Sequence, residues 1–274
     1  SGTFSQFGIS TAHDNSVGWT TELDTAVGYD FNRAFSVRAG IPFYLVNGKT
    51  TTTTSTDTTT TTQQYNSVGD AFIGLSLHPQ FEKYAFALGL VGTAPTGSRT
   101  NGISTGRATA TVSGRAETYI SRFTPFVEGT FGNSLTNTTR YNRPFTTLGT
   151  VSTWTGGTGI DLTKKVSFEA SAFYVQPFGD QKIYSHNMGG AMGAGSGMGG
   201  SMGGSNGKRP FEQAAMTSGT ASIAKDHGFS GDLGFSPTRR VSVDVAYTRS
   251  IAYALDTYSA GLSFRLGHLP GKKF

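Results

Sequence analysis

The chain lacks cysteine altogether, so neither a disulfide bond nor a thiolate nor a cysteine-bound metal is available to it. Charge is also scarce: Asp, Glu, Lys and Arg make up 14% of the residues, against about 25% in a typical soluble domain. No apolar run reaches the roughly twenty residues that a membrane-spanning helix needs. These absences exclude a bundle of membrane helices and weaken the case for a soluble domain.

Helix-favouring stretches of Ala, Leu, Glu and Lys are missing too. Glycine instead supplies 38 of the 274 residues, and Thr and Ser are abundant, which favours strands and loops. The net charge of +5 and the isoelectric point near 9.4 raise the question of a nucleic-acid partner. The bases form rims around the predicted strands rather than one patch, so we expect no nucleic acid.

The residues from Trp19 to Phe31 alternate between two kinds of side chain. One face carries Trp19, Thr21, Leu23, Thr25, Val27, Tyr29 and Phe31, and the other carries Thr20, Glu22, Asp24, Ala26, Gly28 and Asp30. A period of two marks a strand with unlike faces. The run exceeds the about five or six residues of an ordinary strand, and it is typical of a tilted transmembrane strand between lipid and water.

The same alternation recurs along the whole chain. It predicts that residues 1–274 form one domain, an all-β antiparallel transmembrane barrel of about twelve strands, with roughly ten to fourteen as the range. The predicted strands are 3–12, 16–31, 34–46, 67–79, 83–95, 106–120, 123–134, 151–163, 166–177, 220–236, 240–253 and 257–267.

Short and longer connections alternate between these strands. The long ones lie near 47–66, 96–105, 135–150 and 178–219, and the others are tight turns such as Asn32-Arg33. Outer-membrane barrels show this asymmetry, with short periplasmic turns and long external loops. We therefore expect the outer membrane of a Gram-negative-type bacterium, with both chain termini on the periplasmic side.

The last predicted strand carries a spaced pattern of one polar, one glycine, one aromatic and one apolar residue. These residues are Ser259, Gly261, Phe264 and Leu266. The pattern resembles the C-terminal signal that the outer-membrane barrel assembly machinery reads, which implies that this machinery is a partner. The sequence departs from that signal by continuing to Phe274.

A second pattern combines Val68-Gly69-Asp70 with a strand that ends in Pro95-Thr96-Gly97. This pair of stretches resembles the outer-membrane family named for the meta-pathway of phenol degradation. The resemblance covers about one hairpin, with the rest of the chain matching by pattern only. Members of that family are thought to be channels for small, often hydrophobic molecules.

The strand phase places most charged residues on the inward face, because a charge that faces lipid is costly. The predicted pore-lining residues are Glu22, Asp24, Asp30, Arg38, Asp70, Arg115, Glu117, Glu128, Asp161, Glu169, Asp232, Asp244 and Arg265. The lumen is then acidic although the whole chain is basic. Either these groups line a water-filled pore that favours cations, or they pair with one another and fill a closed interior.

The leading hypothesis is a channel or porin for passive passage of small solutes through this narrow, acidic lumen. The alternative is a structural or interaction barrel that self-assembles or binds a partner. Its Thr-rich loop, Lys49–Thr62, and its Gly/Met-rich loop, Asn187–Gly207, would then make the contacts, giving a homo-oligomer or an array. Lipid and lipopolysaccharide are expected partners, and Arg249 is the candidate phosphate contact.

Two other groups of residues were candidates for chemistry. Asp226-His227 is the best candidate for a hydrolase, but neighbours in a strand point to opposite faces, so we expect no enzyme and no catalytic residue. The loop with His186 and four methionines could bind a soft metal such as Cu(I). The competing interpretation is a flexible loop in which Met is incidental, and we expect no metal and no cofactor.

Overall fold

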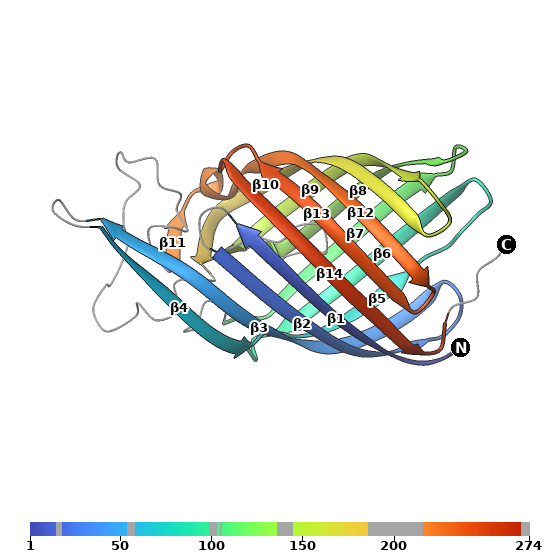
Figure 1. The fold of residues 1–274 in the computed structure, drawn as a ribbon, viewed down its shortest axis with the longest axis horizontal. Coiled ribbons are helices and arrows are strands. Elements are labelled where there is room, and N and C mark those ends of the chain that lie inside the picture. The colour runs from blue at the N-terminus through green and yellow to red at the C-terminus, as the bar shows by residue number, and fades with distance from the viewer. Residues whose placement is uncertain are drawn as a thin grey trace.

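The computed structural model describes residues 1–14, 18–53, 58–98, 103–104, 106–135, 145–185 and 216–269. Figure 1 shows one barrel of tilted strands. Its elements are β1 (Gly2–Asp14), β2 (Gly18–Asp30), β3 (Phe35–Thr53), β4 (Thr58–Val68), β5 (Ala71–Leu77), β6 (Tyr84–Ala94), β7 (Thr109–Thr118), β8 (Phe123–Leu135), β9 (Phe145–Asp161), β10 (Val166–Ser185), β11 (Met216–Gly219), the 3-10 helix η1 (Ala221–Ala224), β12 (Asp226–Thr238), β13 (Val241–Ser250) and β14 (Leu255–Gly267).

Twelve of these strands close into a barrel of antiparallel neighbours. Their order is β10-β12-β13-β14-β1-β2-β3-β5-β6-β7-β8-β9, and β9 pairs again with β10 to complete the ring. The pairing of β1 with β14 joins the first and last strands of the chain, from Phe4 opposite Gly267 to Asp14 opposite Thr257. The predicted all-β barrel of twelve strands is confirmed.

Several predicted boundaries are wrong, all at the end of the barrel that carries the long connections. The stretch 47–66 is mainly a two-stranded ribbon, because β3 and β4 stay paired out to Thr53 and Thr58. β-Branched threonine favours this extended backbone. Parts of 135–150 and 178–219 are likewise strand, in β9, β10 and β11. The predicted strand 220–236 starts only at Asp226, since η1 folds residues 221–224 into a helical turn.

The two ends of the barrel differ. We call the end with the tight turns the short-turn end and the opposite one the long-loop end. The start of β1 and the end of β14 both lie at the short-turn end (Figure 1). Side chains stabilise these turns locally. The Asn32 carboxamide oxygen accepts hydrogen bonds from the backbone of Ala34 and Phe35, both at 2.8 Å. Thr163 does the same for Lys165 and Val166, as Asn and Thr commonly do in turns.

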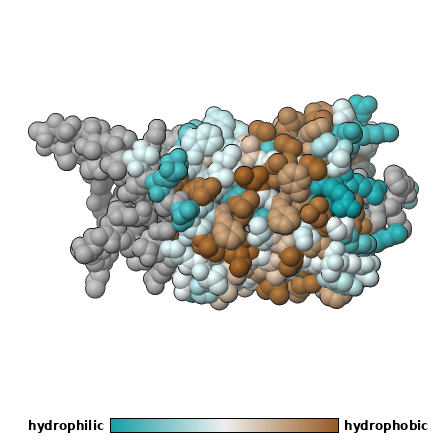
Figure 2. Space-filling model, turned by 60° about the horizontal axis from the view of Figure 1, so that its bottom comes forward, coloured by the Kyte–Doolittle hydropathy of each residue, from teal (hydrophilic) through white to brown (hydrophobic). Residues whose placement is uncertain are grey.

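The outer wall is apolar over a continuous band. On the face that Figure 2 shows, brown side chains cover the middle of the barrel, and teal ones lie beyond them at the short-turn end. Exposed members of this band include Leu23, Val27, Ile73, Leu88, Val127, Leu233 and Val245. Such a band suits lipid contact. No helix in the described part of the chain is both long enough and apolar enough to cross a membrane.

Four phenylalanines on the inner wall each cover a glycine that is their direct cross-strand neighbour. The pairs are Phe4 with Gly28, Phe72 with Gly40, Phe126 with Gly157, and Phe173 with Gly228. A Cβ on Gly28 would lie 2.4 Å from the ring of Phe4, and the other three glycines would meet their rings at 2.8–2.9 Å. The absent side chains therefore make room for rings that lie flat on the wall.

Candidate functional site

The barrel lumen is the candidate functional site, because the charged residues of the strands gather on its wall. The side chains of the exposed apolar residues alternate with those of the predicted pore-lining residues, so the latter share the inward phase. They are Glu22, Asp24, Asp30, Arg38, Asp70, Arg115, Glu117, Glu128, Asp161, Glu169, Asp232, Asp244 and Arg265. Asp161 is exposed at the short-turn rim. Two carboxylates that were not among the predicted pore-lining residues, Asp14 and Asp226, share this phase and are buried.

Arg265 on β14 connects the last strand to the first two. Its guanidinium forms an ion pair with Asp30 on β2 at 2.6 Å and stacks 3.6 Å from the ring centroid of Phe4 on β1. Asp30 is only 3% exposed. A charge that is buried to this degree needs a partner, so Arg265 and Phe4 hold the inner wall together where the barrel closes.

Arg115 on β7 gathers three carboxylates from three strands. Its nitrogens lie 3.0 Å from Glu117, 3.5 Å from Glu128 on β8 and 3.3 Å from Glu169 on β10. Its guanidinium also stacks 3.7 Å from the ring centroid of Phe126. One positive charge faces three negative ones, so this side of the lumen keeps an excess of negative charge. The contact with Glu169 passes over β8 and β9.

Arg38 on β3 differs from the other two inward arginines. Its guanidinium lies 5.5 Å from the ring centroid of Phe72. Among the described residues, no carboxylate oxygen lies within the 4.0 Å of an ion pair with it. Asp24 lies two inward positions away from Arg38, toward the long-loop end. One of its carboxylate oxygens is buried and accepts no hydrogen bond from the described part of the chain. Glu22 next to it accepts a hydrogen bond from the Tyr44 hydroxyl at 3.3 Å.

The two stretches that carry the meta-pathway resemblance meet in space. The backbone N–H of Gly97 donates to the Asp70 carboxylate at 3.0 Å. The Thr96 hydroxyl accepts from Ala71 N–H at 2.8 Å and donates to the Gly69 carbonyl at 3.2 Å. A Cβ on Gly97 would lie 2.8 Å from the backbone of Gly69. These contacts tie the start of β5 to the segment after β6, so Asp70 has a structural partner besides facing the lumen.

The long-loop half of the inner wall also carries two buried apolar clusters, which were not predicted from the sequence. Val151, Phe173 and Val175 form one buried cluster. Ile183, Ile223, Tyr253 and Leu255 form another, in which the Tyr253 hydroxyl donates to the carbonyl of Ile223 in η1 at 2.6 Å. The available signal was the phase of β10, since Phe173 and Val175 alternate in step with Glu169.

The structure separates the residues that suggested other chemistry. Asp226 is 1% exposed and accepts a hydrogen bond from the Ser250 hydroxyl at 2.7 Å, whereas His227 is exposed on the other face. Arg249 lies on the outward face near the long-loop end. It pairs with Asp256, which also accepts from the Tyr247 hydroxyl at 2.7 Å. His186, the four loop methionines and Phe274 lie outside the described residues.

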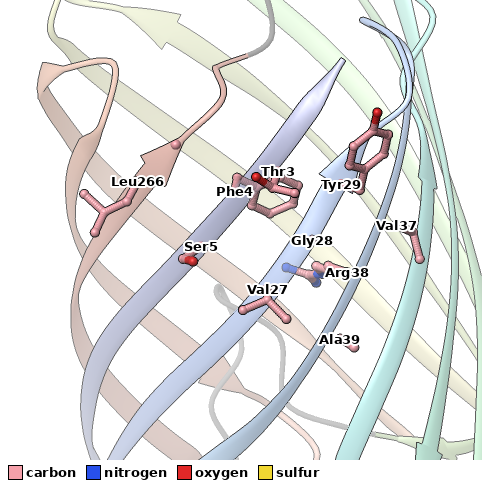
Figure 3. Close-up of a pocket in the computed structure, with 11 residues that line it drawn as sticks. Thr3, Phe4, Ser5, Val27, Gly28, Tyr29, Val37, Arg38, Ala39 and Leu266 are labelled. Atoms are coloured by element: carbon pink, nitrogen blue, oxygen red, sulfur yellow. The ribbon is translucent and has the colours of Figure 1, made fainter.

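A groove of about 560 Å³ crosses the wall between β14 and β3 and does not belong to the lumen. Its sides are outward residues such as Val27, Tyr29, Val37 and Leu266 (Figure 3). Phe4, Gly28 and Arg38, which have the inward phase, also line it, but most of its lining residues face outward. The groove is therefore part of the lipid-facing surface.

No family model matches the sequence, and no curated protein matches it. Solved structures do share its fold. An outer-membrane channel from Pseudomonas putida F1 is 7% identical, with a TM-score of 0.55, and the match covers 97% of this chain and 95% of the channel. The KdgM porin, solved with disordered oligogalacturonate, is 8% identical, with a TM-score of 0.51, and the match covers 94% of this chain and 98% of the porin. The fold is thus that of bacterial outer-membrane β-barrels.

Proposed function

We propose that this chain is an outer-membrane channel through which small solutes pass passively along a narrow, acidic lumen. One observation carries the proposal: most carboxylates of the strands share the inward phase, and these outnumber the inward bases, which are Arg38, Arg115 and Arg265 in the described strands. Charged walls of one sign concentrate ions of the other sign. The short-turn end would face the periplasm, as in other barrels of this type.

The test is the conductance of the purified, refolded barrel in a planar bilayer under a salt gradient. We expect a stable current whose reversal potential shows a preference for cations. A folded barrel that carries no current would contradict the channel and favour a closed lumen.

We also propose that the chain belongs with the meta-pathway family that its hairpin resembles. The support is the contact between Gly69-Asp70 and Thr96-Gly97, which gives both stretches of the resemblance one structural role. Members of that family are thought to carry small, often hydrophobic molecules, so the proposal implies a solute with an apolar part. Flux of neutral solutes of matched size and rising apolar content through the reconstituted barrel tests this: a flux that follows size alone would contradict it.

A second candidate function is an interaction barrel that assembles with copies of itself. It is favoured by the ribbon of β3 and β4, because β4 pairs with β3 and with no other described strand. β4 contains no proline and no charged residue, the usual devices that protect a free edge. Since the chain has no cysteine, a single Thr60→Cys variant would report pairing directly. Disulfide-linked dimers in native-like membranes would support assembly, and monomers would contradict it.

A further inference from the structure

Arg38 and Asp24 are oppositely charged, face the same lumen and do not touch. Neither the guanidinium of Arg38 nor the buried Oδ1 of Asp24 has a hydrogen-bond or ion-pair partner in the described chain. Buried charges in proteins are normally paired, and the other two inward arginines are. This separated pair therefore has unused capacity for a ligand that carries both charges.

The wall between the two charges carries only small, apolar residues. Asp24 lies opposite Pro42 and Arg38 lies opposite Gly28, so the two residues are two inward positions apart on neighbouring strands, about 13 Å along the strand. The position between them is occupied by Ala26 and Gly40, a directly paired couple. The Phe72 ring covers Gly40, and the Arg38 guanidinium leans over the same ring. An arginine at one end, a carboxylate at the other and an aromatic floor form a cradle.

The carboxylate end of the cradle is the stronger attractor. Glu22 follows Asp24 at the next inward position toward the long-loop end and is held by Tyr44. An ammonium group would meet two carboxylates there, whereas a carboxylate group would meet the single guanidinium of Arg38. Guanidinium groups bind carboxylates through charge-assisted hydrogen bonds.

We propose that this cradle, Asp24, Ala26, Phe72 and Arg38, binds a small zwitterion, with its ammonium group at Asp24 and its carboxylate at Arg38. The inference rests on the proposed channel and names the class of solute that it selects: a linear amino acid rather than a simple cation. Arg38 is then the residue that separates a zwitterion from other cations in an otherwise acidic lumen.

The test measures binding and conductance separately. Isothermal titration of the folded barrel in detergent would compare γ-aminobutyrate with butylamine and butyrate, which carry one charge each on a similar carbon chain. We expect the zwitterion to bind most tightly. Arg38→Gln should weaken its binding about tenfold, as expected for one lost charge-assisted contact, and leave butylamine unchanged. Asp24→Asn should weaken both γ-aminobutyrate and butylamine.

Asp244→Asn is the matched control, because it removes an inward carboxylate on β13, outside the cradle. Circular dichroism checks that each variant is folded. Equal binding of the three probes, or no effect of Arg38→Gln on binding, would contradict the zwitterion site. If a current is measured at the same time, the proposed channel is still supported. Binding as expected in a barrel that carries no current supports the cradle and overturns the channel.

Discussion

Individual glycines set the shape of the inner wall. Gly28 and Gly40 lie beneath the rings of Phe4 and Phe72, and any side chain there would displace a ring that stacks on an arginine. The alternation of residues predicted which of these positions face inward. It did not predict the pairs, because the partner of a glycine depends on strand register, and register is a property of two strands rather than of one.

Replacing Gly28 with valine should therefore destabilise the barrel. The added Cβ would meet both Phe4 and the Val37 carbonyl, and overpacking of this kind costs about 1–3 kcal/mol. Urea unfolding in lipid vesicles measures the loss in free energy of unfolding. Gly156→Ala is the matched control, since nothing lies within 4 Å of its Cβ position. Equal stability of the two variants would contradict the close approach.

His78 offers a measure of the charge on Arg38. It follows β5 at the short-turn end, and partial burial lowers its pKa below the ordinary 6.5, with the positive charge of Arg38 lowering it further. Removing that charge by Arg38→Gln makes protonation of His78 easier, so its pKa should rise toward 6.5 without reaching it. Nuclear magnetic resonance titration of the imidazole tests this. Arg249→Gln, at the other end of the barrel, should leave the pKa unchanged; a rise in that variant instead would argue against a local effect.

At the scale of elements, the side chain of Arg115 links β7, β8 and β10 through its contacts with three carboxylates. Without Arg115, the carboxylates of Glu117, Glu128 and Glu169 would face one another without their shared counter-charge. Arg115→Met should lower the free energy of unfolding by about 1–3 kcal/mol, the usual cost of leaving charged partners unsatisfied. Equilibrium unfolding in the presence of urea measures the change.

A double variant separates this network from simple packing. Glu169→Gln added to Arg115→Met should recover part of the lost stability, because it removes one of the repelling charges. If the two effects merely add, then Arg115 and Glu169 are not coupled.

Elements were predictable wherever unlike residues alternate. From Trp19 to Phe31 every position has a phase, and β2 appears where it was expected. The threonine tract shows no alternation, because identical side chains occupy both faces of a strand. The sequence therefore predicts a loop where the structure has the ribbon of β3 and β4. Ala221 and Ile223 alternate with Thr220 and Ser222, which predicts a strand where the structure has η1.

At the scale of the whole molecule, the pairing of charges in the lumen depends on several strands together and is not visible in any single strand. Phase alone indicated which charges face inward. It could not show that Arg115 and Arg265 have ion-pair partners, whereas Arg38 has none among the described residues. Such pairing crosses strands that are distant in sequence. The same applies to the apolar clusters, which need β10, η1 and the β13–β14 turn together.

If the inward carboxylates set ion preference, removing two of them should lower it. Asp232→Asn with Asp244→Asn should reduce the ratio of cation to anion permeability, because fewer fixed negative charges attract cations. The reversal potential under a salt gradient measures this ratio. Asp256→Asn changes an outward carboxylate and should have no effect. A ratio that stays constant in the double variant would mean that selectivity lies elsewhere.

The ion pair between Arg265 and Asp30 joins the two ends of the chain. Asp30 and Phe4 belong to the first two strands and Arg265 to the last strand, yet the three meet in one contact. Until β14 arrives, a carboxylate that ends up 3% exposed has no counter-charge. A chain cut short before Arg265 would therefore leave Asp30 without its counter-charge where β14 should meet β1. A complete barrel and an unfinished one thus differ by one unpaired carboxylate.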